Sequence, residues 1–136
     1  MAYKLIEIKG IGTEYSGKLS DVRGMMTVEE LLEAGASKKG RETLAEETGI
    51  SESLILRWVN MADLFRINGV AEDFSDLLEA SGVDTVKELR NRVPENLHAK
   101  LVEVNEAQNI AGRTPRLDEV ESWIEQAKEM EPKVTH

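Results

Sequence analysis

"IKGIGTEYSGKL", residues 8–19, decides the fold, because it joins a tight glycine turn to the start of a helix. Gly10 and Gly12 flank one isoleucine, and Thr13 opens a helical pattern. Glycine adopts positive φ without steric penalty, so this spacing predicts a turn between two helical segments. A second stretch, "INGVAEDFSDLL" at residues 67–78, shows nearly the same pattern. We call these stretches the first and second hairpins.

The two hairpins belong to an internal repeat. Three pairs of segments match in the same order, which indicates a duplication. They are the two hairpins, "TVEEL" at 27–31 with "TVKEL" at 85–89, and "WVNMA" at 58–62 with "WIEQA" at 123–127. We expect one single domain, 1–136, made of a repeat unit over about 1–65, a second over about 66–131 and a short C-terminal tail at 132–136.

The fold class predicted from residue spacing is all-α. Leu, Ala, Glu and Lys recur at helical intervals, aromatic residues are scarce, and β-branched runs are short. Capping signals divide this pattern into short helices. We expect helices at about 13–21, from the Thr27 cap to Gly35, from the Ser37 cap to Gly49, from the Ser51 cap through Phe65, at 72–80, from the Thr85 cap, from Pro94 through Val104, and from a Thr114 cap to a point before Pro132.

Some buried positions follow from the same pattern. The first helix is expected to bury Tyr15, Leu19 and Val22. Trp58 and Trp123 hold equivalent places in the repeat, so both are expected in the core. We therefore expect two pseudo-repeated units of short helices packed into one compact domain.

Composition limits the function. The chain has no cysteine, which excludes disulfides, thiolate metal sites and thiol catalysis. No apolar run is long enough for a membrane span, and no basic leader precedes one, so we expect a cytoplasmic protein that binds no membrane. The formal net charge of -9 opposes general attraction to nucleic acid, but residues 1–41 hold seven basic against six acidic side chains. A phosphate site is electrostatically tolerable only in that N-terminal third.

The first hairpin has the chemistry of such a site. Backbone amides in a glycine turn, together with free amides of the next helix, can surround a phosphate oxygen. The candidate residues are Lys9 and Lys18 for charge, Gly10, Ile11 and Gly12 for amides, and Thr13 for a hydroxyl, with the side chain of Ile11 pointing inward. Lys38, Lys39 and Arg41 would extend the footprint. The alternative is a helical turn that binds nothing.

The second hairpin differs at the positions that matter for phosphate. Ala71 replaces the glycine at position 12, and a left-handed backbone there would strain it by about 1–2 kcal/mol. Glu72, Asp73 and Asp76 follow. At about 6 Å in water each carboxylate would repel a phosphate by about 0.7 kcal/mol, and together they outweigh the roughly 0.3–1 kcal/mol from a helix N-terminus. We therefore expect the second hairpin to be structural.

A competing DNA-binding motif lies between the hairpins. "TLAEETGISESLILRWV", residues 43–59, resembles the helix-turn-helix of transcription regulators. The side chains that would then face the major groove are Ser51, Glu52, Ser53, Arg57 and Asn60. Acidic residues crowd that approach, and two helices packed across a glycine turn need the same spacing, so this hypothesis is disfavoured.

Neither catalysis nor a cofactor is expected. His98 is the sole internal histidine and has no second nitrogen ligand near it in the sequence. No Ser/His/Asp spacing and no Walker-type glycine loop is present. The sequence therefore predicts that the protein is not an enzyme and holds no metal.

The hairpin pattern resembles the helix-hairpin-helix motif of DNA repair and recombination proteins. Nearly the whole chain is similar to an uncharacterised bacterial domain family built on a duplicated helix-hairpin-helix unit, through "IKGIG", "TVEELLEAGASKKGRETLAEETGIS", "RWVNMADL", "INGV", "GVDTVKEL" and "ENLHAKLVEVN". "TVEELLEAG" also resembles the C-terminal domain of the bacterial RNA polymerase α subunit. The resemblance implies a fold, nucleic-acid binding by analogy, and no catalytic residues.

Two functions follow as hypotheses. The first is weak, sequence-independent contact with a DNA or RNA backbone through the first hairpin. The second is a protein-interaction or scaffold module that binds no nucleic acid, in which the acidic second half meets a basic partner. The oligomeric state stays open.

Overall fold

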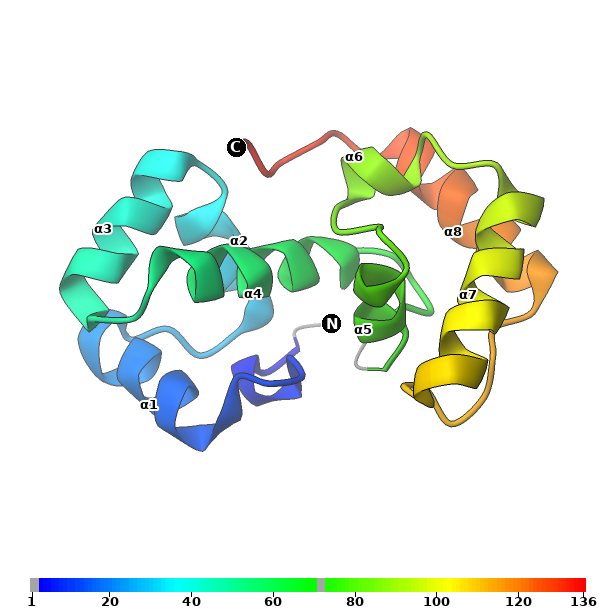
Figure 1. The fold of residues 1–136 in the computed structure, drawn as a ribbon. Coiled ribbons are helices and arrows are strands. Elements are labelled where there is room, and N and C mark those ends of the chain that lie inside the picture. The colour runs from blue at the N-terminus through cyan, green and yellow to red at the C-terminus, as the bar shows by residue number, and fades with distance from the viewer. Residues whose placement is uncertain (1–2, 71–72) are drawn as a thin grey trace. The chain divides into compact units, whose positions relative to one another are not determined.

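The structure is a computed structural model that describes residues 3–70 and 73–136. Within these residues every helix or strand element is a helix (Figure 1), apart from one isolated β-bridge between Lys4 and Thr27. The elements are η1 (Leu5–Glu7), α1 (Gly12–Arg23), α2 (Val28–Gly35), α3 (Lys38–Thr48), α4 (Glu52–Leu64), α5 (Asp73–Ala80), α6 (Val86–Leu89), α7 (Pro94–Gln108) and α8 (Leu117–Glu129). The all-α prediction is confirmed.

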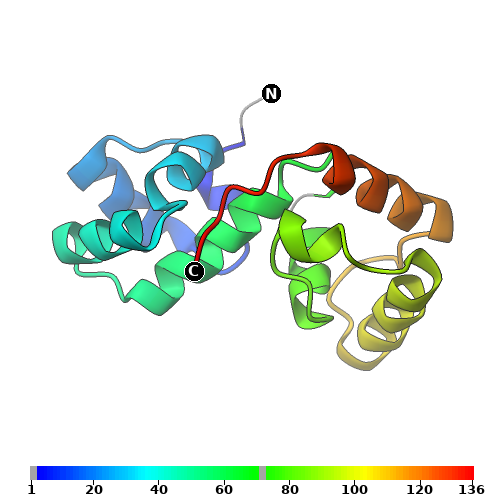
Figure 2. The same cartoon turned by 90° about the horizontal axis from the view of Figure 1, so that it is seen from above.

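The chain divides into two compact units. The first unit comprises Met1–Asp63 with Lys133–His136, and the second comprises Leu64–Pro132. The last four residues, Lys133–His136, at the red end of the chain in Figure 2, belong to the first unit, where the Thr135 amide donates to the carbonyl of Ala36 at 2.8 Å. The single domain and the internal repeat stay predictions. None of the described helices is both long and apolar enough to cross a membrane.

Local capping explains several helix boundaries. The hydroxyls of Thr27, Ser37 and Thr85 each accept a hydrogen bond from the amide three residues later, as the sequence predicted. Gly49 ends α3 with a left-handed φ of 74°. These contacts lie within a few residues of one another, so the sequence alone encodes them.

α2 ends at Gly35, as predicted. Close packing against α4 explains why this residue is a glycine. It is the last residue of the helix and is buried. A Cβ built on Gly35 would lie 2.5 Å from Cγ2 of Val59 in α4. A larger residue would therefore push α2 away from α4.

One predicted core position is wrong. Leu19 is fully buried, whereas Val22 in the last turn of α1 is 47 % exposed. Gly24 ends the helix with a left-handed φ of 65°, which turns the chain back at once. The next residue, Met25, is buried after that turn. The turn thus places a residue beyond the helix in the core, and the last helical turn stays in solvent.

The predicted start of α8 is also wrong. The helix begins at Leu117 with Arg116 as its N-cap, after the predicted Thr114 and Pro115 positions. Oε1 of Glu119 accepts from the Arg116 amide at 2.9 Å. A reciprocal acid three residues into the helix fixes the N-terminus, and the residue three beyond Thr114 is a leucine that cannot do so.

The two units share local features around their glycine turns. Gly10 has a φ of 90° and Gly69 has a φ of 95°. Each turn closes with a hydrogen bond between residues three apart, Ile11 to Ile8 at 3.2 Å and Val70 to Ile67 at 3.1 Å. All four of these apolar side chains are buried. Each turn is thus anchored by apolar side chains on both sides of its glycine.

Each unit also contains one packed aromatic pair. The rings of Tyr15 and Trp58 have centroids 5.1 Å apart, and those of Phe74 and Trp123 are 5.4 Å apart. The angle between the ring planes is 53° in the first pair and 52° in the second. Trp58 and Trp123 are buried, as expected for core residues.

Candidate nucleic-acid interface

The first hairpin has the backbone that its glycines predicted. Gly10 and Gly12 both adopt left-handed conformations, with φ of 90° and 69°. Ile11 between them is 1 % exposed, so its side chain points inward and anchors the turn. A residue with a Cβ would be strained at either glycine.

The N-terminus of α1 is open beside this turn. Ile11 is its N-cap and forms no side-chain capping bond to the first helical turn. Gly12 and Thr13 are exposed, and a Cβ built on Gly12 would meet nothing among the described atoms within 4 Å. An anion can therefore approach the first backbone amides of α1 closely.

The predicted lysines of the hairpin lie in solvent. Lys9 is exposed in the turn, and Lys18 is exposed on α1 with its Nζ 5.9 Å from the centroid of the Tyr15 ring. Glu14, also exposed in the first turn of α1, opposes them. The hairpin thus carries two accessible cations against one nearby carboxylate.

Arg57 is a third cation at this turn, although the sequence pattern placed it in the helix-turn-helix motif. Its Nη1 donates to the carbonyl of Lys9 at 3.2 Å, and the same atom lies 3.1 Å from the position that a Cβ on Gly10 would take. The guanidinium therefore supports the turn from α4. Arg57 and Lys9 are 48 residues apart, and sequence spacing cannot pair residues at that distance.

Of the three residues predicted to extend the footprint, two are exposed and one is buried. Lys38 and Lys39 are exposed in the first turn of α3, which lies at the far end of the first unit from the hairpin (Figure 1). Arg41 is 4 % exposed. Its guanidinium donates to the carbonyls of Gly35, Ala36 and Thr135 at 2.9, 3.0 and 2.6 Å.

Arg41 is therefore a structural residue. Burial lowers the pKa of its guanidinium from the ordinary value, against the opposing attraction of Glu52 and Glu42. Three backbone carbonyls accept from Nη1 and Nη2 of this buried side chain, so neither terminal nitrogen is open to a phosphate in solvent. We leave Arg41 out of the interface proposed below.

The competing helix-turn-helix exposes three of its five predicted reading residues, Ser51, Glu52 and Ser53, but not the other two. α3 and α4 are joined across Gly49 as that motif requires. Asn60, however, is 8 % exposed, and Arg57 turns toward the first hairpin. These two side chains of α4 are thus used inside the first unit.

The second hairpin is described only in part. Ala71 and Glu72 lie outside the described residues. Asp73 and Asp76 are half-buried in the first turn of α5. That this hairpin is structural stays a prediction.

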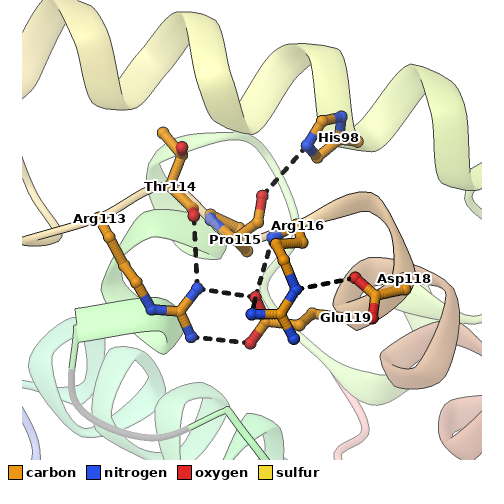
Figure 3. Close-up of polar contacts among 7 residues, drawn as sticks. All are labelled: His98, Arg113, Thr114, Pro115, Arg116, Asp118 and Glu119. Atoms are coloured by element: carbon orange, nitrogen blue, oxygen red, sulfur yellow. Dashed lines mark hydrogen bonds and ion pairs between the residues drawn. The ribbon is translucent and has the colours of Figure 1, made fainter.

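A polar cluster of the second unit joins the loop after α7 to α8 (Figure 3). Nη1 and Nη2 of Arg113 donate to the two carboxylate oxygens of Glu119 at 2.7 and 2.8 Å, and Nε of Arg116 donates to Asp118 at 3.1 Å. The Arg113 hydrogen bonds and the Arg116 amide lower the pKa of Glu119 to about 2, against desolvation. Because each of these charges pairs with another in the cluster, the ion pairs hold the loop after α7 against the first turn of α8.

His98 belongs to the same region. Its Nε2 lies 3.1 Å from the carbonyl oxygen of Pro115, so the half-buried ring ties α7 to the residue before the N-cap of α8 (Figure 3). Across residues 3–70 and 73–136, no three His, Asp or Glu side chains gather as metal ligands would.

Comparison with known proteins gives one match. The model of a family described as "Domain of unknown function (DUF4332)" matches residues 9–130. No curated protein and no solved structure matches the chain. The relation of the two hairpins to helix-hairpin-helix proteins stays a prediction.

Proposed function

The chain belongs to the DUF4332 family, a domain of unknown function, and we propose that its first hairpin binds the phosphate backbone of a nucleic acid without reading its sequence. The role is non-catalytic. The observation that supports it is the pair of left-handed glycines, Gly10 and Gly12, beside a helix N-terminus that has no side-chain cap. Backbone amides in that arrangement are suited to an anion.

The charges around the turn are consistent with a weak site. Lys9 and Lys18 supply accessible cations, and Arg57 holds the carbonyl of Lys9 from behind. The amides of one exposed helix N-terminus add about 0.3–1 kcal/mol. Since the whole chain carries a net charge of -9, a nucleic acid must approach the less acidic first unit.

Salt dependence follows from the number of phosphate contacts. Two to four contacts give a slope of about -2 to -3.6 in a plot of log affinity against log salt. Raising salt from about 50 to 200 mM should then weaken binding by about 10- to 150-fold. Binding insensitive to salt would not be phosphate binding.

The test is a titration of labelled duplex DNA, single-stranded DNA and RNA, followed by fluorescence anisotropy at both salt concentrations. The variant Lys9→Glu with Lys18→Glu should lose at least about tenfold in affinity at low salt. The matched control, Lys87→Glu with Lys100→Glu, makes the same charge change on exposed lysines of α6 and α7. Equal losses in both variants, or no binding by the unaltered protein at low salt, would reject the proposal.

The second candidate is a protein-interaction module. It is supported by two large apolar side chains in solvent, Ile6 at 46 % and Met26 at 63 % exposure. Exposed apolar patches on a soluble domain often mark a partner surface. Retention of nucleic acid without any protein in a pull-down would count against it.

A further inference from the structure

An open groove of about 540 Å³ lies in the first unit beside the first hairpin. Its lining includes Ile6 of η1, four residues of α1 and Met26 of the segment after α1. The four residues of α1 are Thr13, Ser16, Gly17 and Ser20. They follow a spacing of three and four, so they form one stripe along the helix. The groove therefore combines the small side chains of α1 with the apolar side chains of Ile6 and Met26, and Lys4 and Thr27 also line it.

The walls are fixed by hydrogen bonds. The amide of Leu5 donates to the carbonyl of Met26 at 3.2 Å, which joins η1 to the segment after α1. The hydroxyl of Ser20 donates to Sδ of Met26 at 3.3 Å. Ile6 and Met26 are two of the large apolar side chains that remain most exposed in the described chain. The apolar surface is thus held open in advance of any partner.

A strip of carboxylates continues from one end of the groove. Met25, which lines the groove, also lines a neighbouring hollow with Glu29, Glu30 and Glu33 of α2. Oε1 of Glu30 accepts from the amide of Met26 at 3.2 Å. This bond, followed by that from the Thr27 hydroxyl, lowers the pKa of Glu30, which stays ionised.

Two carboxylates of the acidic strip face solvent. Glu29 and Glu33 are both exposed and lie one helical turn apart on α2. Arg23 shares the hollow, but its Nη1 already pairs with Glu47 of α3 at 2.8 Å. The surface next to the apolar groove is therefore negative.

We propose that this groove binds a basic amphipathic helix of a partner protein. Small residues on α1 let the backbone of a second helix approach, and Ile6 with Met26 contacts its apolar side chains. Methionine adapts its shape to different apolar partners. Lysine or arginine side chains at the end of that helix then pair with Glu29 and Glu33. This site rests on the second candidate function, the protein-interaction module, and gives it a partner; it shares Thr13 with the phosphate site of the hairpin but not Lys9 or Lys18.

The test uses a designed helical peptide of about 18 residues, with leucines along one face and lysines on the other. Its control is the same peptide with glutamate in place of every lysine. A titration of the isotope-labelled full chain, followed by NMR, should show the largest amide shifts at Ile6, Gly17 and Met26. The acidic peptide should bind at least about tenfold more weakly. Shifts centred elsewhere, or equal affinity for both peptides, would overturn the proposal.

Two variants of Gly17 test the groove without harming the fold. A Cβ at Gly17 meets nothing among the described atoms within 4 Å, and both alanine and leucine favour a helix more than glycine does. Gly17→Leu should fill the groove and lower peptide affinity by at least about tenfold, whereas Gly17→Ala should change it less than about threefold. Unchanged affinity in Gly17→Leu would overturn the site.

Two further variants separate the charged strip from the hairpin. Glu29→Lys with Glu33→Lys should weaken binding of the basic peptide and strengthen that of the acidic one. The hairpin variant Lys9→Glu with Lys18→Glu should bind the basic peptide at least as tightly as the unaltered protein does, because it makes the surface more negative, although it should lose affinity for nucleic acid. Sedimentation that shows a dimer lost in Gly17→Leu would instead assign the groove to a second copy of the chain and overturn the partner helix.

Discussion

The guanidinium of Arg57 donates to the carbonyl oxygen of Lys9 at 3.2 Å, so a residue in the middle of α4 supports the turn before α1. This contact fixes the glycine turn against the longest helix of the first unit. A Cβ on Gly10 would lie 3.1 Å from the same nitrogen, so the guanidinium would have to shift slightly to admit a side chain there. The turn is therefore hydrogen-bonded to α4 at Lys9 and exposed to solvent at Gly12.

Arg57→Ala should destabilise the protein by about 0.5–1.5 kcal/mol, because the variant removes an exposed hydrogen bond made by a half-buried side chain. Urea denaturation measures the change. Arg57→Lys should recover part of the stability, since it keeps the charge but loses the planar fork. A stability equal to that of the unaltered protein in Arg57→Ala would show that the turn does not depend on this contact.

Gly12→Ala should cost about 1–2 kcal/mol, because a φ of 69° strains an alanine backbone even where space is open. Gly17→Ala in the same helix is the matched control and should stabilise by about 1 kcal/mol. Thermal unfolding of the two variants compares them directly. Stabilisation by both substitutions would contradict a left-handed residue at position 12.

Gly35→Ala should destabilise by about 1–3 kcal/mol, because the new methyl group meets Val59 at 2.5 Å. Helix propensity alone would favour alanine by about 1 kcal/mol, so the sign of the change shows which effect is larger. Combining Gly35→Ala with Val59→Ala should relieve the clash, and the double-mutant cycle should give a coupling above about 0.5 kcal/mol. Additive effects would mean that the two residues do not touch.

Arg41→Leu should destabilise by about 2–4 kcal/mol, since it leaves three carbonyl groups without their buried donor. Nucleic-acid affinity per folded molecule should stay the same, because Arg41 does not face the hairpin. Urea denaturation and anisotropy give the two readouts. A selective loss of affinity with normal stability would return Arg41 to the interface.

Glu119 should make the second unit sensitive to acid. Its folded pKa of about 2 lies below the ordinary 4.5, so its contribution is complete above the unfolded pKa and is lost as pH falls toward 2. With a side chain 19 % exposed, we expect Glu119→Gln to cost about 1–3 kcal/mol at neutral pH and almost nothing near pH 2.

Denaturation at about pH 7 and pH 2 measures this dependence. The control Glu125→Gln removes a carboxylate of the same helix that is 72 % exposed and pairs weakly with Lys128 at 3.5 Å. It should change stability by less than about 0.5 kcal/mol at either pH. A similar pH dependence in both variants would contradict the special position of Glu119.

How much of this molecule the sequence predicts depends on the distance along the chain over which each contact acts. The caps at Thr27, Ser37 and Thr85 involve residues three apart, and all three were predicted. The inward Ile11 and the left-handed glycines followed from the turn spacing alone. Local chemistry is readable because the partners are adjacent in the chain.

Longer contacts escaped prediction. Arg41 was assigned to the surface, and its burial depends on the carbonyl of Thr135 at the other end of the chain. Arg57 was assigned to a different motif because its partner, Lys9, is 48 residues away. The groove at Ile6 and Met26 was also missed, since neither residue belongs to a periodic helix face. Tertiary packing decides such positions, and one sequence carries no direct signal for it.

The two aromatic pairs give this protein a built-in optical assay. Each unit contains one tryptophan, Trp58 or Trp123, and each indole packs against a ring of its own unit, Tyr15 or Phe74. Indole emission shifts to longer wavelength when water reaches the ring. Replacing one tryptophan by phenylalanine therefore leaves a chain whose fluorescence reports the melting of one chosen unit. Cooperative or separate melting of the two halves can then be read from unlabelled protein.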